Sequence, residues 1–292
     1  MRKIKDRFGV ILFLFLSLIS GSVLIGILLF LGIYGLRTFA EVRFTDFLFG
    51  TVWNPDAYGQ PQYGLLPNLW GTFLTSFLAM LIALPSGIFG ALFLSERIAG
   101  RWRLGIKTLV ELFAGFPSVV IGFLGLTIVA PLISKLFNVP SGIGVLNASL
   151  ILALMALPTI ISISDDALRA VPNSFREASY ALGASKWQTS VKVVLPAAKF
   201  GVMAASLLGF GRAVGETMAV LMVAGNAPII AKSLFDPTRT ITTTIAIELG
   251  EVASNTTHFY TLFTLGLVLF LISLFVNLLS MFIQKKEREI LL

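Results

Sequence analysis

Residues 8–34 read FGVILFLFLSLISGSVLIGILLFLGIY, an apolar run with no charged residue between Arg7 and Arg37. About 20 apolar residues in a helix cross the roughly 30 Å of bilayer hydrocarbon, because each residue rises about 1.5 Å. This run is therefore long enough to span a membrane. A basic start precedes it, but its length and the lack of a small-residue cleavage site predict an uncleaved anchor rather than a secretory signal peptide.

The rest of the chain repeats this pattern. Of the 292 residues, 56% are hydrophobic and 13% are charged, whereas soluble domains are about 45–50% apolar and about 25% charged. This composition excludes a soluble enzyme, a disordered protein and a nucleic-acid-binding domain. It predicts an all-α integral membrane protein with six transmembrane helices. The other five apolar segments are 68–94, 108–134, 147–164, 200–225 and 259–283. Pro85, Pro117 and Pro158 fall inside them and are expected to kink the helices.

Lysine and arginine are distributed unevenly between the two sides of these helices. If the chain begins in the cytoplasm, the segments outside the helices that face the cytoplasm hold 16 of the 22 basic residues, and the segments that face the other side hold five. The remaining basic residue, Arg212, lies within the fifth helix. Cytoplasmic loops of membrane proteins carry the excess of positive charge. Both termini are therefore predicted to be cytoplasmic.

The longest predicted cytoplasmic piece, 165–199, contains two helix-start patterns. Ser174–Glu177 and Ser185–Gln188 both fit the capping box, in which the two side chains satisfy exposed amides at the helix start. Gly183 lies between them, where a left-handed residue commonly ends a helix. We therefore expect two short helices joined by a sharp turn, the second ending before Pro196.

The same loop contains residues at the spacing of a known sequence motif. It resembles the EAA loop of ABC importer permeases, with Ser179 in place of the second alanine and Val193 in place of isoleucine. The resemblance implies a type I importer (MetI-like) permease fold whose coupling helices contact a separate ATPase. A capped helical hairpin on the membrane surface is the alternative, but it does not explain why Leu195–Pro196 lies at the position that the motif requires. The residues implied in coupling are Glu177, Ala178, Gly183, Leu195 and Pro196.

Three more segments narrow the resemblance to the phosphate-specific PstC family, over about residues 60–283. They are Gly71-Thr72-x-x-Thr75-Ser76, Phe116-Pro117-Ser118-Val119-Val120-x-Gly122 and Gly211-Arg212-Ala213-x-Gly215-Glu216-Thr217-Met218-Ala219-Val220. The family implies a bacterial cytoplasmic (inner) membrane location, a PstA-like second permease, a PstB-like ATPase dimer and a PstS-like phosphate-binding protein. Residues 1–67 would form an anchor helix and outer loop, and residues 68–292 the importer core.

Arg212 and Glu216 are the strongest candidates for a substrate pathway. A charge at the bilayer centre costs at least about 2.5–3.5 kcal/mol, which makes Arg212 a functional candidate. On a continuous helix Glu216 would share its face. A guanidinium matches the oxygens of phosphate, and Glu216 would keep the anion from binding too tightly for release. A structural ion pair is the alternative, since small residues at every fourth position from 197 to 213 allow close helix packing there.

Other polar residues within the helices are weaker candidates. Thr72, Thr75, Ser76 and Ser118 could line the pathway or could equally bond to their own helix backbone. The chain has no cysteine, a single histidine (His258, to which we assign no role) and no phosphate-binding loop pattern. It is therefore not expected to be an enzyme, to bind a metal or to hold a cofactor. ATP and Mg²⁺ would be bound by the partner ATPase.

The leading hypothesis is a permease subunit of an ATP-driven phosphate importer, embedded in lipid and without a nucleic-acid partner. A permease for another oxyanion, sulfate or molybdate, is a second hypothesis. A stand-alone secondary carrier or channel is a third, although carriers often show two similar halves and none is apparent here. A sensory scaffold that reports phosphate status is a fourth.

Overall fold

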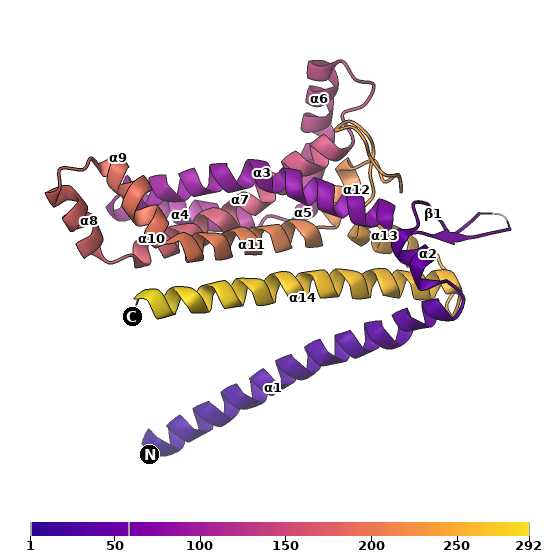
Figure 1. Ribbon diagram of the computed structural model, residues 1–292, viewed down its shortest axis with the longest axis horizontal. Coiled ribbons are helices and arrows are strands. Elements are labelled where there is room, and N and C mark those ends of the chain that lie inside the picture. The colour runs from indigo at the N-terminus through magenta and orange to yellow at the C-terminus, as the bar shows by residue number, and fades with distance from the viewer. Residues whose placement is uncertain (1, 58, 292) are drawn as a thin grey trace.

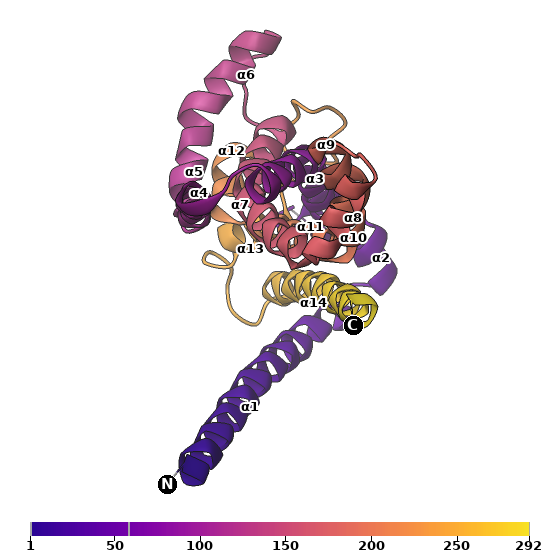
Figure 2. The ribbon, with the colours of Figure 1, turned by 90° about the vertical axis from the view of Figure 1, so that its left-hand side faces the viewer.

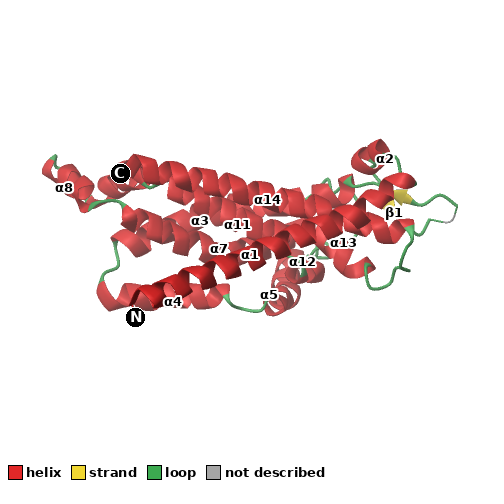
Figure 3. Ribbon diagram, turned by 90° about the horizontal axis from the view of Figure 1, so that it is seen from below, coloured by secondary structure: helices red, strands yellow, loops and turns green. Residues whose placement is uncertain are grey.

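The fold is a bundle of long helices whose axes run roughly in one direction (Figure 1). The computed structural model describes residues 2–57 and 59–291. Helices make up most of it, beside one short pair of strands (Figure 3). Among the described residues, five helical stretches are long and apolar enough to cross a bilayer. A sixth is added if two segments that meet at 74° count as one. The predicted all-α, multi-span fold is confirmed.

Three helices form the core of the bundle: α3 (Leu66–Glu96), α7 (Val145–Ala170) and α11 (Lys199–Gly215). Ile160 of α7 is fully buried between the other two. A Cβ atom added at Gly87 would lie 2.6 Å from Ile160 Cγ2, and one at Gly209 would lie 2.8 Å from Ile160 Cγ1. Both glycines therefore let their helix backbones approach α7 closely. The row of small residues predicted around Arg212 is buried from Gly201 to Ala213.

Two further helices flank this core: α14 (Thr257–Leu291) and α1 (Arg2–Gly35). They meet near Gly35, where an added Cβ atom would lie 3.2 Å from the backbone of Thr264. The Thr264 hydroxyl donates a hydrogen bond to the Gly35 carbonyl at 2.8 Å. Away from this contact α1 diverges from the bundle (Figure 2). The most apolar stretch of α1 is 0% buried within the chain, and its role as an anchor stays a prediction.

Short elements close the end of the bundle where α1 meets α14. The strands are antiparallel, with Trp53 opposite Tyr63. Phe47, Trp53 and Ile241 are buried in a small hydrophobic cluster that ties these elements together. The elements are η1 (Leu36–Ala40), α2 (Phe44–Phe49), β1 (Trp53–Asn54), β2 (Gln62–Tyr63) and α13 (Ile241–Glu248).

The third predicted helix, 108–134, is not continuous, which corrects the sequence prediction. The chain leaves the helix between Gly115 and Pro117. Proline lacks the amide hydrogen and disfavours helical geometry at the residue before it, here Phe116. Pro85 and Pro158, in contrast, lie inside the continuous helices α3 and α7. The pieces of this segment are α4 (Gly100–Ala114), α5 (Ser118–Leu124), the π-helical η2 (Gly125–Val129) and α6 (Ala130–Phe137).

The fifth predicted helix, 200–225, is also broken. Helix α11 ends at Gly215, and Glu216 is extended, with φ −70° and ψ 133°, before α12 (Met218–Val223) begins. Two glycines near the end of α11, Gly211 and Gly215, lower the helix propensity at this point. The break changes which residues surround Arg212.

Candidate functional site

Arg212 lies in the last turn of α11, and its side chain is half-buried. Its Nη2 donates a hydrogen bond to the carbonyl of Ala114 at 2.9 Å, and its Nη1 donates to Thr159 Oγ1 at 3.4 Å. The Ala114 carbonyl is available because α4 ends there, and the last carbonyls of a helix have no partner within it. Arg212 therefore joins α11 to α7 and to the break in the third predicted span.

The prediction that Glu216 and Arg212 share one face of a helix is wrong. Helix α11 ends before Glu216, whose Oε1 accepts the amide hydrogen of Ala219 at 3.2 Å. The Glu216 carbonyl accepts a hydrogen bond from Thr242 Oγ1 at 2.8 Å. Within the described part of the chain, no carboxylate lies within ion-pair distance of Arg212. Arg212 is thus a cation in an apolar segment, and its hydrogen-bond partners among the described residues are both neutral oxygens.

The other pathway candidates are bound mainly to backbone groups. Thr72 donates to the Asn68 carbonyl at 2.8 Å and accepts the amide hydrogen of Ile241 at 2.9 Å, which secures the start of α13. Thr75 donates to the Gly71 carbonyl at 2.7 Å. The Ser76 hydroxyl is buried without a hydrogen-bond partner in the described structure, and Ser118 is half-buried in the first turn of α5. Their place in a pathway stays a prediction.

The loop that resembles the EAA motif forms two short helices, α8 (Asn173–Ala181) and α9 (Lys186–Thr189). Gly183 has φ +80°, the left-handed geometry expected of a helix terminator, and the Ser185–Gln188 capping box is present. Glu177 and Ala178 are exposed. Ser179 is buried and shares a hydrogen bond of 2.9 Å with Thr189, which fixes α8 against α9.

Two details of this loop differ from the prediction. The Ser174–Glu177 capping box is absent because α8 begins at Asn173, with Pro172 at the N-cap position, so that Ser174 lies inside the helix and not at its cap. The second helix does not end before Pro196. It continues through η3 (Ser190–Val194) and α10 (Leu195–Ala197), since proline is tolerated in the first turn of a helix.

Arg176 anchors this loop to the core, a role that sequence reasoning missed. Its Nη2 lies 2.8 Å from Glu96 Oε1 at the end of α3. The same guanidinium donates to the carbonyls of Leu168 at 2.9 Å and Val171 at 2.8 Å. One side chain therefore connects α8 to the ends of both α3 and α7. The charge pair Arg176–Glu96 spans 80 residues of sequence, and no local spacing reveals it.

A second ionic cluster holds α4 against α7 at the same end of the bundle. Asp165 is fully buried and pairs with Arg103, and its Oδ2 lies 3.5 Å from Lys107 Nζ. Lys107 also pairs with Asp166 and lies 3.9 Å from Glu111. Asp165 and Asp166 of α7 are therefore ion-paired with basic residues of α4, which links the two helices.

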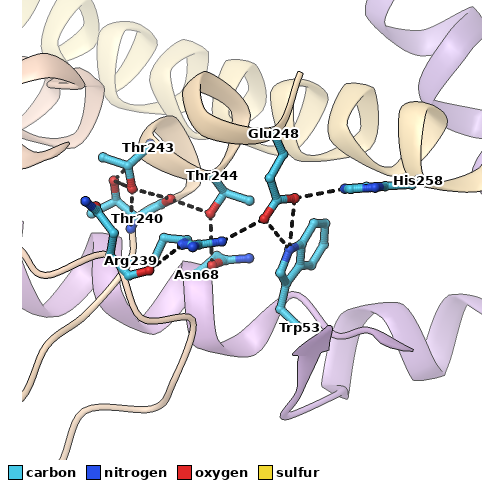
Figure 4. A network of polar contacts seen from close by, with 9 residues as sticks. Trp53, Asn68, Arg239, Thr240, Thr243, Thr244, Glu248 and His258 are labelled. Atoms are coloured by element: carbon cyan, nitrogen blue, oxygen red, sulfur yellow. Dashed lines mark hydrogen bonds and ion pairs between the residues drawn. The ribbon is translucent and has the colours of Figure 1, made fainter. Parts of the chain in front are cut away.

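At the opposite end of the bundle, Glu248 is the centre of a polar network (Figure 4). Its carboxylate accepts hydrogen bonds from Trp53 Nε1 at 3.1 Å and lies 2.7 Å from Arg239 Nη1. His258 Nε2 lies 2.9 Å from the same carboxylate. Thr244 Oγ1 donates to Asn68 Oδ1 at 3.0 Å nearby. The network ties the strand pair, α3, α13 and α14 together, and gives His258 a structural role that the sequence did not indicate.

The chain matches the family model described as "Binding-protein-dependent transport system inner membrane component" over residues 83–289. The probable ABC transporter permease protein YqgH of Bacillus subtilis is 41% identical over 275 residues, covering 93% of this chain and 88% of that protein. The phosphate transport system permease protein PstC of Pasteurella multocida is 37% identical over 310 residues, covering 98% and 92%.

Solved transporter structures share the fold. A chain of a bacterial alginate ABC transporter, in complex with an alginate-bound periplasmic protein, superposes with a TM-score of 0.60 at 17% identity, covering 91% of this chain and 92% of that one. A chain of the MetNI methionine ABC transporter in an inward-facing form gives 0.53 at 24% identity, covering 75% and 94%. The chain therefore belongs to the binding-protein-dependent transport system inner membrane component family, within the PstC group of ABC transporter permeases.

Proposed function

We propose that this chain is the permease subunit of an ATP-driven importer that carries inorganic phosphate across the bacterial cytoplasmic membrane. Relatives that match over most of the chain are named as phosphate transport permeases. The observation that carries the proposal is Arg212, a half-buried cation whose only described partners are a carbonyl and a hydroxyl. Hydrogen bonds from a guanidinium to a phosphate oxygen are stronger than those to neutral oxygens. An arriving phosphate can therefore replace the present partners of Arg212.

The bound anion must also be released, and in this proposal the carboxylate of Glu216 promotes its release. The residue follows directly on α11 and is held in place by Ala219 and Thr242. Its negative charge near the pathway weakens the attraction of Arg212 for phosphate. A conducting site must bind strongly enough to admit the ion and weakly enough to release it.

The energy comes from partner subunits in this proposal, because the chain lacks a phosphate-binding loop. A PstB-like ATPase pair, which binds ATP and Mg²⁺, would contact the exposed face of α8 and α9, where Leu182 is 90% exposed. Arg176 and its ion pair with Glu96 would pass the motion of this loop to α3. A PstA-like permease and a PstS-like binding protein complete the complex. The permease must change between two conformational states during transport, and each state is stabilised by the contacts that these subunits make in that state.

The proposed orientation places α8, α9 and both ends of the described chain on the cytoplasmic side. Figure 1 shows α8, α9 and both ends of the described chain at the same end of the bundle. The predicted excess of Lys and Arg on this side supports the assignment. The strand pair and the Glu248 network then face outward, toward the binding protein.

Anion competition tests the substrate. Cells without their own phosphate importers would express the complex, and uptake of radiolabelled phosphate would be measured. An excess of unlabelled phosphate should abolish labelled uptake, while equal excesses of sulfate and of molybdate should leave it unchanged. Competition by sulfate or molybdate as strong as that by phosphate would assign the permease to another oxyanion.

A further inference from the structure

A groove of about 480 Å³ lies where the end of α3 meets α9 and η3. Its wall on α3 is largely apolar, and the rings of Phe89 and Phe93 are each 60% exposed. Trp187 of α9 forms the opposite wall and is 51% exposed. The contacts described above for phosphate do not include this groove, and it borders the proposed ATPase contact, with which it shares Trp187 of α9. Its remaining lining residues are Leu92, Glu96, Arg97 and Ser190.

The groove carries one uncompensated positive charge. Glu96 is its only acidic lining residue, and Arg176 neutralises it at 2.8 Å. Arg97 is exposed, and its side chain has no hydrogen bond or ion pair among the described residues. An anion in this groove would therefore meet the guanidinium of Arg97 without a competing carboxylate.

The charge and the apolar wall lie at different depths along α3. Arg97 follows the last residue of this spanning helix, whereas Phe89 lies eight residues earlier, a separation of about 12 Å at 1.5 Å per residue. The cation is thus at headgroup level, and the phenyl rings extend into the hydrocarbon region. Tryptophan favours this interfacial level, which suits the position of Trp187 beside the cation.

We propose that this groove binds an anionic phospholipid. Its phosphate contacts Arg97, one acyl chain lies against Phe89 and Phe93, and the indole of Trp187 covers the glycerol region. Free phosphate would use the single charge of Arg97 and none of the apolar wall, so the two-part lining favours a lipid. Since the groove joins α3 to α9, a bound lipid would hold the proposed coupling loop (residues 165–199) in its position on the core.

Lipid retention tests the proposal. The full chain would be purified with its partner subunits from membranes containing phosphatidylglycerol and phosphatidylethanolamine, and bound lipid would be counted by native mass spectrometry. Wild type should retain phosphatidylglycerol in preference to phosphatidylethanolamine, and Arg97→Gln should lower the retained amount several-fold. Arg101→Gln is the matched control, because Arg101 is an exposed arginine on α4 outside the groove. Equal retention by the two variants, or no lipid preference in wild type, would overturn the proposal.

A fluorescence measurement that leaves Arg97 unchanged covers the case in which Arg97→Gln does not assemble. The complex would be placed in nanodiscs containing brominated phosphatidylglycerol or brominated phosphatidylcholine, and the quenching assigned to Trp187 would be obtained by subtracting that of Trp187→Phe. Stronger quenching by the anionic lipid supports the site. Equal quenching by the two lipids contradicts it. Neither readout depends on phosphate transport, so the outcome is separate from that of the proposed function.

Discussion

At the residue scale, the environment of Arg212 is one of several polar contacts that join the helices of this bundle in addition to apolar packing. Its guanidinium spans the gap from α11 to the last carbonyl of α4 at 2.9 Å. The sequence marks Arg212 as a charge in an apolar segment, but it cannot reveal this partner. Ala114 contributes only its backbone, 98 residues away, and no side-chain pattern encodes such a contact. The sequence also misplaces Glu216, because hydropathy continues across Gly215 although the helix does not.

Replacing Arg212 tests its role in anion attraction. A hydrogen bond to a charged group contributes about 1.5–3 kcal/mol, which corresponds to about a 10- to 100-fold change in affinity. Arg212→Gln should therefore lower phosphate uptake by at least about tenfold, whereas Arg212→Lys should lose less, because it keeps the charge without the planar fork. Initial uptake rates would be compared at equal amounts of assembled, ATP-binding complex. Unchanged uptake by Arg212→Gln would remove Arg212 from the pathway.

Packing at Gly209 provides a test of the core. A Cβ atom there would lie 2.8 Å from Ile160 Cγ1, while one at Gly215 would have no atom within 4 Å. Gly209→Ala should destabilise the purified protein by about 1–3 kcal/mol, the usual cost of overpacking. Gly215→Ala, on the same helix, should not. Thermal unfolding in detergent measures the difference, and equal midpoints for the two variants would show that α7 and α11 do not pack as described.

At the element scale, the length of the apolar segments indicates which segments can cross the membrane. It indicates less well where each helix ends. The segment around Pro117 carries a recognisable break signal, whereas the break at Gly215 is visible only when Glu216 is seen to accept the Ala219 amide. The coupling loop was predicted more completely, because Gly183 and the Ser185 capping box are local features. Its anchor, Arg176, depends on a distant partner and was missed.

Loss of the Arg176–Glu96 pair should loosen the coupling loop. Removing one partner of a largely buried ion pair leaves the other charge uncompensated and commonly costs about 3–5 kcal/mol. Arg176→Met should therefore accelerate proteolytic cleavage within residues 171–185 of the detergent-purified protein. Arg169→Gln is the control, since Arg169 is exposed at the end of α7. Equal cleavage rates for both variants would mean that the ion pair does not hold the loop.

At the scale of the whole molecule, composition and the distribution of basic residues were enough to predict a multi-span helical protein. They did not predict the divergence of α1 from the bundle or the projection of α6 away from it (Figure 2). Both depend on how far a helix remains in contact with its neighbours. The length over which two helices stay in contact depends on individual close contacts, such as that between Gly35 and Thr264. Average hydropathy does not encode such contacts.

Cysteine labelling tests the proposed orientation, and the absence of native cysteine makes single-cysteine variants unambiguous. Leu182 and Gln60 are both exposed, at opposite ends of the bundle. A membrane-impermeant maleimide should label Gln60→Cys in cells whose inner membrane is intact, and Leu182→Cys only after that membrane is permeabilised. The reverse pattern would invert the topology, and labelling of both before permeabilisation would place both ends on the outside.

In the proposed function, phosphate moves through this chain only when a separate ATPase drives the transport. The most direct measurement is accumulation of radiolabelled phosphate in proteoliposomes that contain the chain with its permease, ATPase and binding-protein partners. Accumulation against a gradient should require ATP and should stop when the ATPase carries a substitution that blocks hydrolysis. Continued accumulation with the inactive ATPase, or with this chain alone, would rule out an ATP-driven importer and identify a carrier.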